Sequence, residues 1–287
     1  MKHPWDKAAL LRSPLFRPLH PAIEGLSIDS PAADGFPSLQ DCNDLSASGA
    51  ITVHNGLPLR FVAQEYGRLP FEAQYEPRCY LKGEVQTRAD NWHDLLNALV
   101  WLAFPKAKSA INVRHYEALT VGDAPTGASP GEASRSQRGS VRDMNTLFDE
   151  SGVVVAYADR ELAGLLRDFR WKELFWSRRE RVRENMGFFL FGHGLYEKAL
   201  QPYVGMTGQG LLLQVEPAFF DWPLGRQMAY LDESLAHYLT APEHCRRTAE
   251  LTPVPLLGVP GWTPDNENAA YYDNSAYFRP GRSRQPA

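Results

Sequence analysis

Apolar positions are densest in residues 91–115, NWHDLLNALVWLAFPKAKSAINVRH. Between positions 95 and 104 no side chain is charged, and Asn97 is the single amide among apolar neighbours. An apolar pattern that runs around every face predicts a helix buried on all sides. Asn91 suits the cap before the first turn, and Asp94 follows three residues later, as in a capping box. The pattern therefore predicts a core helix that begins near Asn91 and carries polar residues at both ends.

The second half of this segment leaves two geometries open. Pro105 disfavours helical backbone at Phe104 and suits the first turn of a new helix, which we expect over residues 106–118. If the chain folds back here as a tight helical hairpin, His93 and His115 become neighbours. If it continues with a gentle kink, the two histidines lie roughly 33 Å apart at about 1.5 Å per residue. Both geometries satisfy the pattern.

Hydrophobic spacing elsewhere predicts shorter elements. Leu231, Leu235 and Leu239 share one face of a predicted helix. Helices are predicted at residues 37–48, 159–184, 187–200 and 224–240. Strands are predicted at residues 59–63, 75–85 and 211–215, with a hairpin of two short strands at residues 144–158. These elements predict a mainly helical α+β fold, a single compact domain with a small antiparallel sheet and an extended C-terminal arm.

Composition divides the chain into three parts: a proline-punctuated segment at residues 1–50 that packs on the body, the main domain at residues 51–250, and the arm at residues 251–287. Within the body, residues 121–140 hold Gly, Pro, Ala and Ser with almost no apolar side chain, so we expect a flexible loop. The arm is rich in Pro, Gly and aromatic residues, and we expect Trp262 and Phe278 to be buried against the body.

Charge and cysteine content narrow the classes of function. The net charge is −4, so the chain has no global attraction to nucleic acid or to an anionic membrane. No apolar run approaches the roughly 20 residues that span a bilayer, and the N-terminus lacks the apolar stretch of a signal peptide. The 3 cysteines are widely spaced, which fits a reducing compartment better than a disulfide framework. We therefore expect a cytoplasmic protein with no membrane partner.

Two histidines are placed for chemistry within apolar helices. His93 and Asn97 are four residues apart, and His193 and Glu197 repeat this spacing, so each pair shares a helical face. Imidazole and carboxylate at this spacing can hold a divalent metal or act as an acid–base pair. The candidate catalytic residues are His93, Asp94, His115, His193 and Glu197, and the candidate metal ligands are His93, His115, His193 and Glu197. The alternatives are a helix cap at Asp94 and a buried polar network with a structural role.

The glycines at positions 192 and 194 flank His193 within this second apolar segment. Glycine lowers helix propensity, so a helix that accepts two of them needs another group close to its backbone.

Residues 167–184, RDFRWKELFWSRRERVRE, combine seven basic and four acidic side chains with four aromatic rings. Such a segment can contact a phosphate backbone and stack on bases. The alternative is a solvated helix face with buried tryptophans, and the acidic net charge favours this alternative. Nucleic acid is therefore not the expected partner.

Three strings in the chain resemble a known family. They are NWHDLLNALVWLAFPKAKSAINVRH, then TLFDESGVVVA with WKELFW and FGHGLYEKAL, and finally PVPLLGVPGWTPDNENAAYYDNSAYFRP. Together they are similar to the uncharacterised bacterial domain-of-unknown-function family numbered 3025, over roughly residues 75–282. Leu96 and Gly194 stand where we would expect Phe and Ala. The resemblance implies no activity, substrate or cofactor.

Two hypotheses of function follow from the residues. The first is a small-molecule or hydrolytic enzyme that uses the His/Asp/Glu site, with a divalent metal as the candidate cofactor and a small molecule as the candidate ligand. The second is a non-catalytic binding or scaffold protein that uses the basic aromatic segment and the arm. Convergence of the polar residues in one pocket would favour the enzyme.

Overall fold

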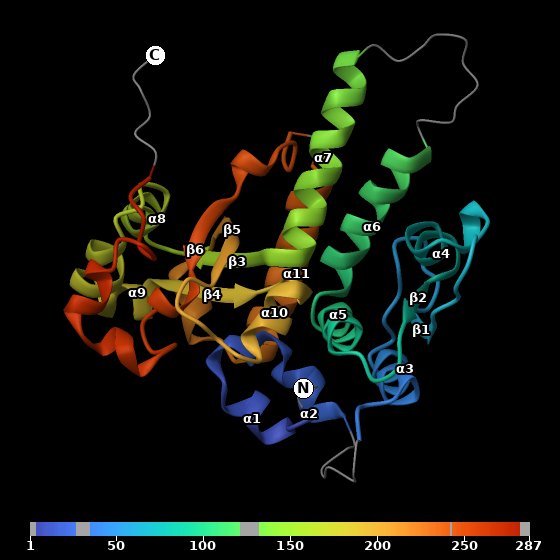
Figure 1. Ribbon diagram of the computed structural model, residues 1–287, viewed down its shortest axis with the longest axis horizontal. Coiled ribbons are helices and arrows are strands. Elements are labelled where there is room, and N and C mark those ends of the chain that lie inside the picture. Colours follow the sequence, from blue (N-terminus) through green and yellow to red (C-terminus); the bar gives the residue numbers. More distant parts are fainter. Residues whose placement is uncertain (1–3, 27–34, 121–131, 242, 282–287) are drawn as a thin grey trace.

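The computed structural model describes residues 4–26, 35–120, 132–241 and 243–281 (Figure 1). Its main sheet contains β3 (Gly152–Tyr157), β4 (Met186–Leu190), β5 (Thr207–Gln214) and β6 (Thr252–Pro255), in the order β4-β3-β5-β6. All six residues of β3 are buried, as expected for a central strand covered on both faces. The sheet is thus the layer on which the other elements pack.

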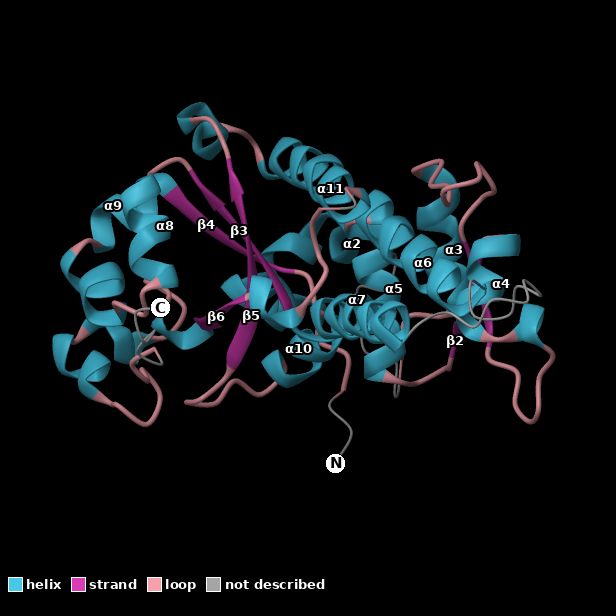
Figure 2. Ribbon diagram, turned by 90° about the horizontal axis from the view of Figure 1, so that it is seen from above, coloured by secondary structure: helices cyan, strands magenta, loops and turns pink. Residues whose placement is uncertain are grey.

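Helices cover both faces of this sheet (Figure 2). The helices α8 (Arg160–Arg167) and α9 (Arg179–Asn185) lie on one side with the C-terminal arm. The helices α7 (Glu132–Ser151), α10 (His193–Ala199) and α11 (Leu224–Thr240) lie on the other side. The prediction of a mainly helical α+β fold is confirmed. The sheet was expected to be antiparallel but is mixed, because β3 and β5 pair in parallel while β4 and β6 flank them antiparallel.

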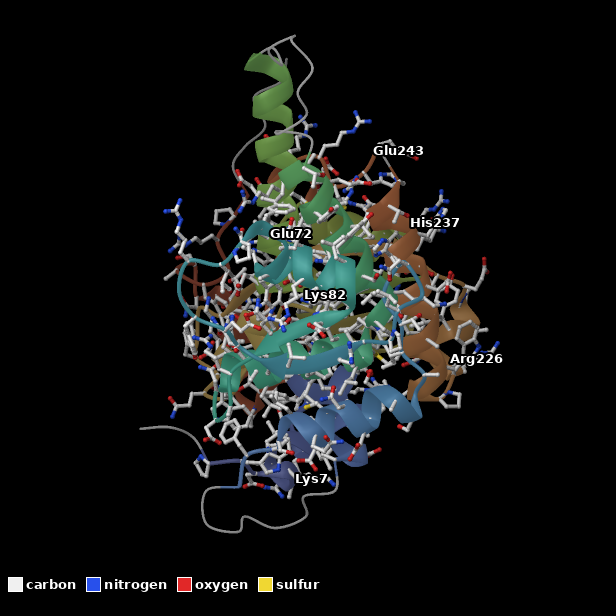
Figure 3. The ribbon with its side chains drawn as sticks, turned by 90° about the vertical axis from the view of Figure 1, so that its right-hand side faces the viewer. Lys7, Glu72, Lys82, Arg226, His237 and Glu243 are labelled. Carbon is white, nitrogen blue, oxygen red and sulfur yellow. The ribbon has the colours of Figure 1, made fainter. Side chains whose placement is uncertain are left out.

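A smaller unit packs beside α6 (Pro105–Thr120), away from the main sheet. In it α3 (Leu39–Ser48) precedes β1 (Arg60–Ala63), and α4 (Tyr75–Lys82) connects β1 to its parallel partner β2 (Glu84–Thr87). Figure 3 views the molecule from this side, with Lys82 on α4 facing the viewer and with Arg226 and His237 projecting from α11 at the rim. The helix α3 begins at a capping box formed by Ser38 and Asp41, close to its predicted start.

The core helix α5 (Trp92–Ala103) begins where the sequence predicts, with the Asn91 side chain accepting a hydrogen bond from the Asp94 amide. It ends at Phe104, whose backbone leaves the helical region at φ −134° and ψ 57°. The next helix, α6 (Pro105–Thr120), then departs at a steep angle (Figure 1). The chain therefore forms neither a tight hairpin nor a gentle kink. The first amides of α6 are capped from another element, because the Asp232 carboxylate of α11 accepts hydrogen bonds from the amides of Lys106 and Ala107.

Two predicted elements were wrong in type. Residues 75–82 form helix α4 instead of an extended stretch, because Pro77 lies in the first turn, where its missing N–H costs nothing, and Gly83 ends the helix at φ 69°. Residues 144–151 complete the long helix α7 instead of a hairpin strand. Gly152 makes the change from α7 to β3, since a Cβ there would lie 2.3 Å from the Phe148 carbonyl oxygen.

Residues 187–200 divide into two elements, strand β4 and helix α10, with Gly192 capping the helix. The helix predicted over residues 159–184 is likewise broken. Phe169 adopts a left-handed conformation at φ 59°, and a π turn at Glu173–Ser177 separates α8 from α9. The spacing of apolar residues did not predict these breaks in the helices, because buried strands and buried helices both contain dense apolar runs.

The terminal segments pack on the body. Two short helices, α1 (Lys7–Arg12) and α2 (His20–Gly25), flank the 3-10 turn Pro14–Leu19, in which Leu15 and Phe16 are buried. The C-terminal arm contributes β6 and a series of 3-10 turns. Phe278 is buried, as predicted, and Trp262 is partly buried against the core.

The prediction of a flexible loop at residues 121–140 is wrong for residues 132–140. Residues 132–140 belong to α7, and residues 121–131 lie outside the described part of the chain. Among the described residues, no helix combines the length and the apolar character needed to cross a membrane.

Candidate functional site

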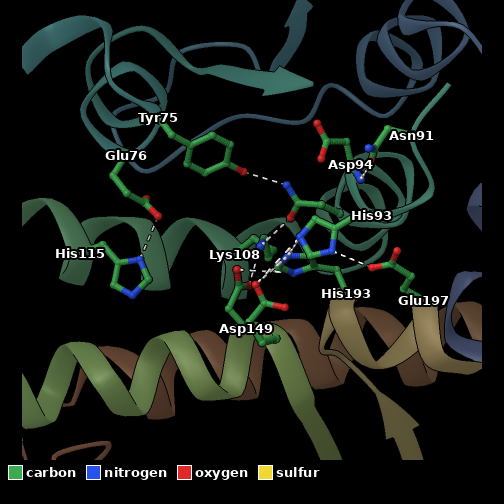
Figure 4. A network of polar contacts seen from close by, with 12 residues as sticks. Tyr75, Glu76, Asn91, His93, Asp94, Lys108, His115, Asp149, His193 and Glu197 are labelled. Carbon is green, nitrogen blue, oxygen red and sulfur yellow. Dashed lines mark hydrogen bonds and ion pairs between the residues drawn. The ribbon is translucent and has the colours of Figure 1, made fainter. Parts of the chain in front are cut away.

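Three helix ends meet on the α5 side of the main sheet and bring His93, His193 and Glu150 together. Figure 4 shows the two histidines side by side. His93 lies in the first turn of α5, His193 is the first residue of α10, and Glu150 lies in the last turn of α7. The helix α10 packs against both α5 and α7, so the three side chains come from mutually supporting elements. A site built on helix ends in this way is held by the packing of the core.

The ring nitrogens of the two histidines face each other. His93 Nε2 lies 3.1 Å from His193 Nε2. The Glu150 Oε1 atom lies 3.5 Å from His193 Nε2 and 4.0 Å from His93 Nε2. His193 is buried, whereas His93 and Glu150 are partly exposed. The group therefore has one buried side and one accessible side.

The opposite nitrogen of each ring faces a carboxylate. His93 Nδ1 lies 2.9 Å from Glu197 Oε2. His193 Nδ1 lies 3.6 Å from Asp149 Oδ2, and it is buried without a hydrogen-bond partner. Both imidazoles are thus placed between a carboxylate at Nδ1 and the shared space at Nε2.

This arrangement cannot be satisfied by two neutral imidazoles. If His93 donates its Nδ1–H to Glu197, its Nε2 carries a lone pair, and His193 must donate Nε2–H across the 3.1 Å gap. The Nδ1 lone pair of His193 then faces Asp149 with no proton between them. Either an imidazolium at His193 or a cation between the two Nε2 atoms removes this conflict. The geometry therefore calls for a positive charge at this point.

A buried chain of polar groups supports the site from below. Lys108 is 3% exposed and donates to Asp149 and to Asn97, and Asn97 donates to the Tyr75 hydroxyl at 2.7 Å. Burial alone would raise the pKa of Asp149, but the charges of Lys108 and His193 outweigh burial and hold that pKa below its ordinary value. The contact with His193 likewise lowers the pKa of Glu150. Both carboxylates therefore stay ionised beside the histidines.

His115 and Asp94 do not join this group. His115 Nδ1 lies 3.0 Å from Glu76 Oε1 on α4, and its Nε2 is buried without a hydrogen-bond partner (Figure 4). Asp94 accepts hydrogen bonds from the backbone and guanidinium of Arg88 at 2.7–3.0 Å. Asp94 is thus a structural carboxylate that ties β2 to α5.

A cavity of about 770 Å³, hereafter the main cavity, opens between α4, α5, α6 and α7. Its lining includes the groups described above: Tyr75, Glu76, His93, Asn97, His115, Asp149, Glu150 and His193. A second hollow of about 510 Å³ reaches His93 and Glu150 from the side of Glu197. The histidine pair therefore lies where two solvent-accessible hollows approach each other, and His115 shares the larger one with it.

The sequence predicted a site of five residues and missed Glu150, Asp149 and Lys108; the five were His93, Asp94, His115, His193 and Glu197. The two missed acids were assigned to a hairpin, with Glu150 in its Glu-Ser-Gly turn. The sequence feature that could have identified Asp149 and Glu150 is that they form an adjacent Asp-Glu pair inside the apolar string TLFDESGVVVA, which also carries the family resemblance.

Both glycines beside His193 admit a close neighbour, as predicted. A Cβ at position 194 would lie 2.3 Å from Glu150 Oε2, and one at position 192 would lie 2.4 Å from the Ser151 backbone nitrogen. Glycine at these positions therefore lets the end of α7 approach the start of α10.

The three cysteines play no part in the site. Cys42, Cys79 and Cys245 are all buried, and desolvation raises the pKa of each thiol. A thiol that stays protonated is a poor nucleophile and a poor metal ligand.

The basic aromatic segment is engaged in internal contacts. Trp171 and Phe175 are buried. Its basic side chains form ion pairs with nearby acids: Arg170–Glu173, Lys172–Asp273, Arg178–Glu161, Arg179–Glu267, Arg181–Asp159 and Arg183–Glu180. The segment therefore offers less free charge than its sequence suggests.

Comparison with known families adds one finding to this geometry. Residues 59–282 match the pattern of the family described as protein of unknown function, DUF3025. The chain belongs to the DUF3025 family. This confirms the resemblance on the strings quoted above, and those strings include His93, Glu150 and His193. No curated protein and no solved structure matches the chain in the other two comparisons. The family description supplies no activity, so function must be argued from the site.

Proposed function

We propose that this DUF3025 protein is a metal-dependent hydrolase of a small polar molecule. In this proposal His93 Nε2, His193 Nε2 and a Glu150 oxygen hold one divalent cation, and the main cavity holds the substrate beside it. The observation that carries the proposal is the position of the two imidazoles, each with a carboxylate at Nδ1 and with their Nε2 atoms 3.1 Å apart.

The distances suit a small tetrahedral cation. Zinc binds histidine nitrogen and carboxylate oxygen at about 2.0–2.2 Å, so neighbouring ligand atoms are about 3.3 Å apart. The three separations here are 3.1, 3.5 and 4.0 Å. The longest involves the end of the flexible Glu150 side chain, where a small rotation shortens it.

A metal also explains more of the site than a proton does. A proton on His193 Nε2 would have to serve two acceptors, His93 at 3.1 Å and Glu150 at 3.5 Å. A cation would bond all three groups and leave both Nδ1–H groups to donate to Glu197 and Asp149. Carboxylates at the second nitrogen are the usual outer support of histidine ligands and fix their tautomer.

The ligand set leaves a coordination position open toward solvent. When bound, a zinc ion in such a three-ligand site lowers the pKa of its water to about 7 and polarises a carbonyl or phosphoryl group. Other residues supply the remaining chemistry. His115, oriented by Glu76 and lining the same cavity, can accept or donate a proton through Nε2. Lys108 balances the Asp149 charge beneath the metal position.

Elemental analysis of protein purified without an affinity tag tests the proposal. We expect about one equivalent of zinc per chain, since three protein ligands and one open position are typical of catalytic zinc. His193→Ala and Glu150→Ala should lose it, whereas His237→Ala, on the exposed surface of α11, should retain it. Ferrous iron in place of zinc would keep the ligand assignment and replace hydrolysis with oxygen chemistry. Absence of metal after incubation with zinc, manganese and iron would refute the metal site and leave the histidines as an acid–base pair.

A further inference from the structure

We infer that the ligand of the main cavity carries an oxyanion, a carboxylate or phosphate group, that Arg68 and Arg142 bind while the rest of the molecule reaches the histidine pair. This inference rests on the proposed function, because it names the substrate class of the same cavity. Along the wall of the main cavity, the acidic hydrogen-bond acceptors already have partners, whereas two strong donors have none among the residues that the structure describes.

The acidic side chains of the wall already have cationic partners. Asp94 is paired with Arg88, and Asp149 is paired with Lys108. Glu65 is paired with Arg78 at 2.6 Å. Their charges are therefore compensated before any ligand enters.

The remaining acids in the wall are matched by histidines. Glu76 contacts His115 at 3.0 Å and also accepts from the Asn112 side chain. Glu150 faces His193 and His93 and is assigned to the metal. A cationic ligand would thus have to displace an existing partner from whichever carboxylate it approached.

Two donors of the wall are in the opposite situation. Arg68 lies in the loop between β1 and α4, and Arg142 lies on α7, so they approach the cavity from two different elements. Both side chains are exposed, and neither forms an ion pair or hydrogen bond with another residue that the structure describes. A guanidinium offers a planar fork of N–H donors that matches the two oxygens of a carboxylate or phosphate. The unused binding capacity of this wall is therefore for anions.

A buried histidine adds a further contact for the ligand. His115 is 8% exposed, and its Nε2 has no hydrogen-bond partner. With Nδ1–H donated to Glu76, the Nε2 lone pair is left to accept a hydrogen bond from an O–H group of the bound ligand. A divalent cation on the histidine pair would add further positive charge at the other end. A cavity of about 770 Å³ holds a molecule large enough to reach both ends.

Isothermal titration calorimetry of the full chain, with bound metal retained and free metal removed, tests this assignment. The probes are inorganic phosphate in one arm and acetate in the other, in a chloride buffer of low ionic strength. We expect saturable binding in at least one arm, and the arm that binds identifies the anion. Arg68→Gln and Arg142→Gln should each weaken binding about 5-fold, and the double variant at least about 10-fold, because charge-assisted hydrogen bonds are lost. Arg160→Gln, which removes an exposed arginine at the start of α8, should leave the affinity within about 2-fold.

Three outcomes would overturn the inference. The first is that neither phosphate nor acetate binds saturably. The second is that the wild type and the Arg68/Arg142 double variant bind the anion with equal affinity. The third is that His93→Ala loses anion binding while the double variant does not. The last outcome would place the anion on the metal alone. Metal content measured on the same samples separates these results from failure of the hydrolase proposal. If the chain holds no metal, the hydrolase proposal fails, and the effect of the two arginine substitutions on anion binding still tests the inference.

Discussion

Two regions of this molecule are dense in charged and aromatic side chains, and they differ in how their polar groups are satisfied. In the segment 167–184 the tryptophan at position 171 is buried with its Nε1 donating to a backbone carbonyl, and most of its arginines pair with acids. Arg178 Nε is buried without a partner, but the same guanidinium pairs with Glu161. At the histidine pair, by contrast, one buried ring nitrogen has no partner and two Nε2 atoms face each other. Density of charge therefore says little about function. Buried polar groups without hydrogen-bond partners are more informative about function, because they destabilise the fold and a purely structural network would avoid them.

Two carboxylates of the helical layer, the partly buried Asp149 and the buried Asp232, show the same contrast. Asp149 lies beside Lys108 and His193, and these charges keep its pKa low although burial opposes them. Asp232 is buried and faces backbone amides of α6, and desolvation raises its pKa to about 6. One carboxylate is kept charged by cations that belong to the site. The other caps a helix and becomes neutral in mildly acidic conditions.

The largest expected effect concerns Lys108. Lys108→Met should reduce the free energy of unfolding by about 3–5 kcal/mol, because it leaves the partly buried Asp149 without its cation. The control is Lys106→Met, which removes a solvent-exposed ion pair with Glu233 and should cost less than about 1 kcal/mol. Urea unfolding of both variants measures the difference. Equal losses would show that the network beneath the histidines is no more than surface electrostatics.

The second effect tests the structural role of the basic aromatic segment. Trp171→Ala should cost about 3–5 kcal/mol, since the ring is 5% exposed and lies against Phe169 and Phe175. Arg183→Gln removes a partly exposed ion pair and should cost less than about 1 kcal/mol. Thermal and chemical unfolding compare the two. If Trp171→Ala is as stable as the wild type, the ring has no structural role and the segment is again a candidate binding surface.

A third, pH-dependent effect separates the two carboxylates. The folded pKa of Asp232 is about 6 against an ordinary value of 3.8, so the folded state binds the proton more tightly than the unfolded state does. Its contribution to stability is fully present below about pH 4 and is lost as the pH rises through 6, by roughly 3 kcal/mol. Asp232→Asn should therefore remove this fall from the pH profile of unfolding. If the difference in free energy of unfolding between the wild type and Asp232→Asn stays constant from pH 4 to 7, the pKa of Asp232 is not raised.

The smallest effect concerns the outer support of the histidines. Glu197→Gln keeps an acceptor for His93 Nδ1 but removes the charge, and it should weaken metal binding about 10-fold. Glu233→Gln, an exposed acid on α11, should leave metal affinity unchanged. Competition with a chromophoric chelator gives both values. If Glu197→Gln binds metal as tightly as wild type, the carboxylate does not orient His93.

The sequence predicted some parts of the fold and site better than others, for physical reasons. The helix at Leu224–Thr240 was predicted with both boundaries, because Leu231, Leu235 and Leu239 mark one clean face. The helix α7 was missed, since its last turns are polar apart from a few core residues and the Glu-Ser-Gly string is typical of a turn. Glu150 was lost with it. Residue spacing reports local periodicity, whereas the position of Glu150 depends on how α7 meets α10.

The angle between α5 and α6 could not be predicted either. Pro105 permits several directions, and the choice is made by Asp232, more than a hundred residues away, which caps the first amides of α6. That direction places His115 on the wall of the main cavity and outside the ligand group of His93. Local sequence therefore identified the histidines but not Glu150, and long-range packing decided which side chains share a centre.

The central claim is that His93, His193 and Glu150 form one metal centre, and X-ray absorption spectroscopy of the zinc-loaded protein tests it most directly. We expect two imidazole nitrogens and one carboxylate oxygen at about 2.0–2.2 Å, with a solvent oxygen completing the shell. Because His193→Ala should lose the metal, this variant treated with zinc in the same way should show no shell with two imidazoles. A shell of oxygen alone, a sulfur ligand, or the same two imidazoles in His193→Ala would contradict the account.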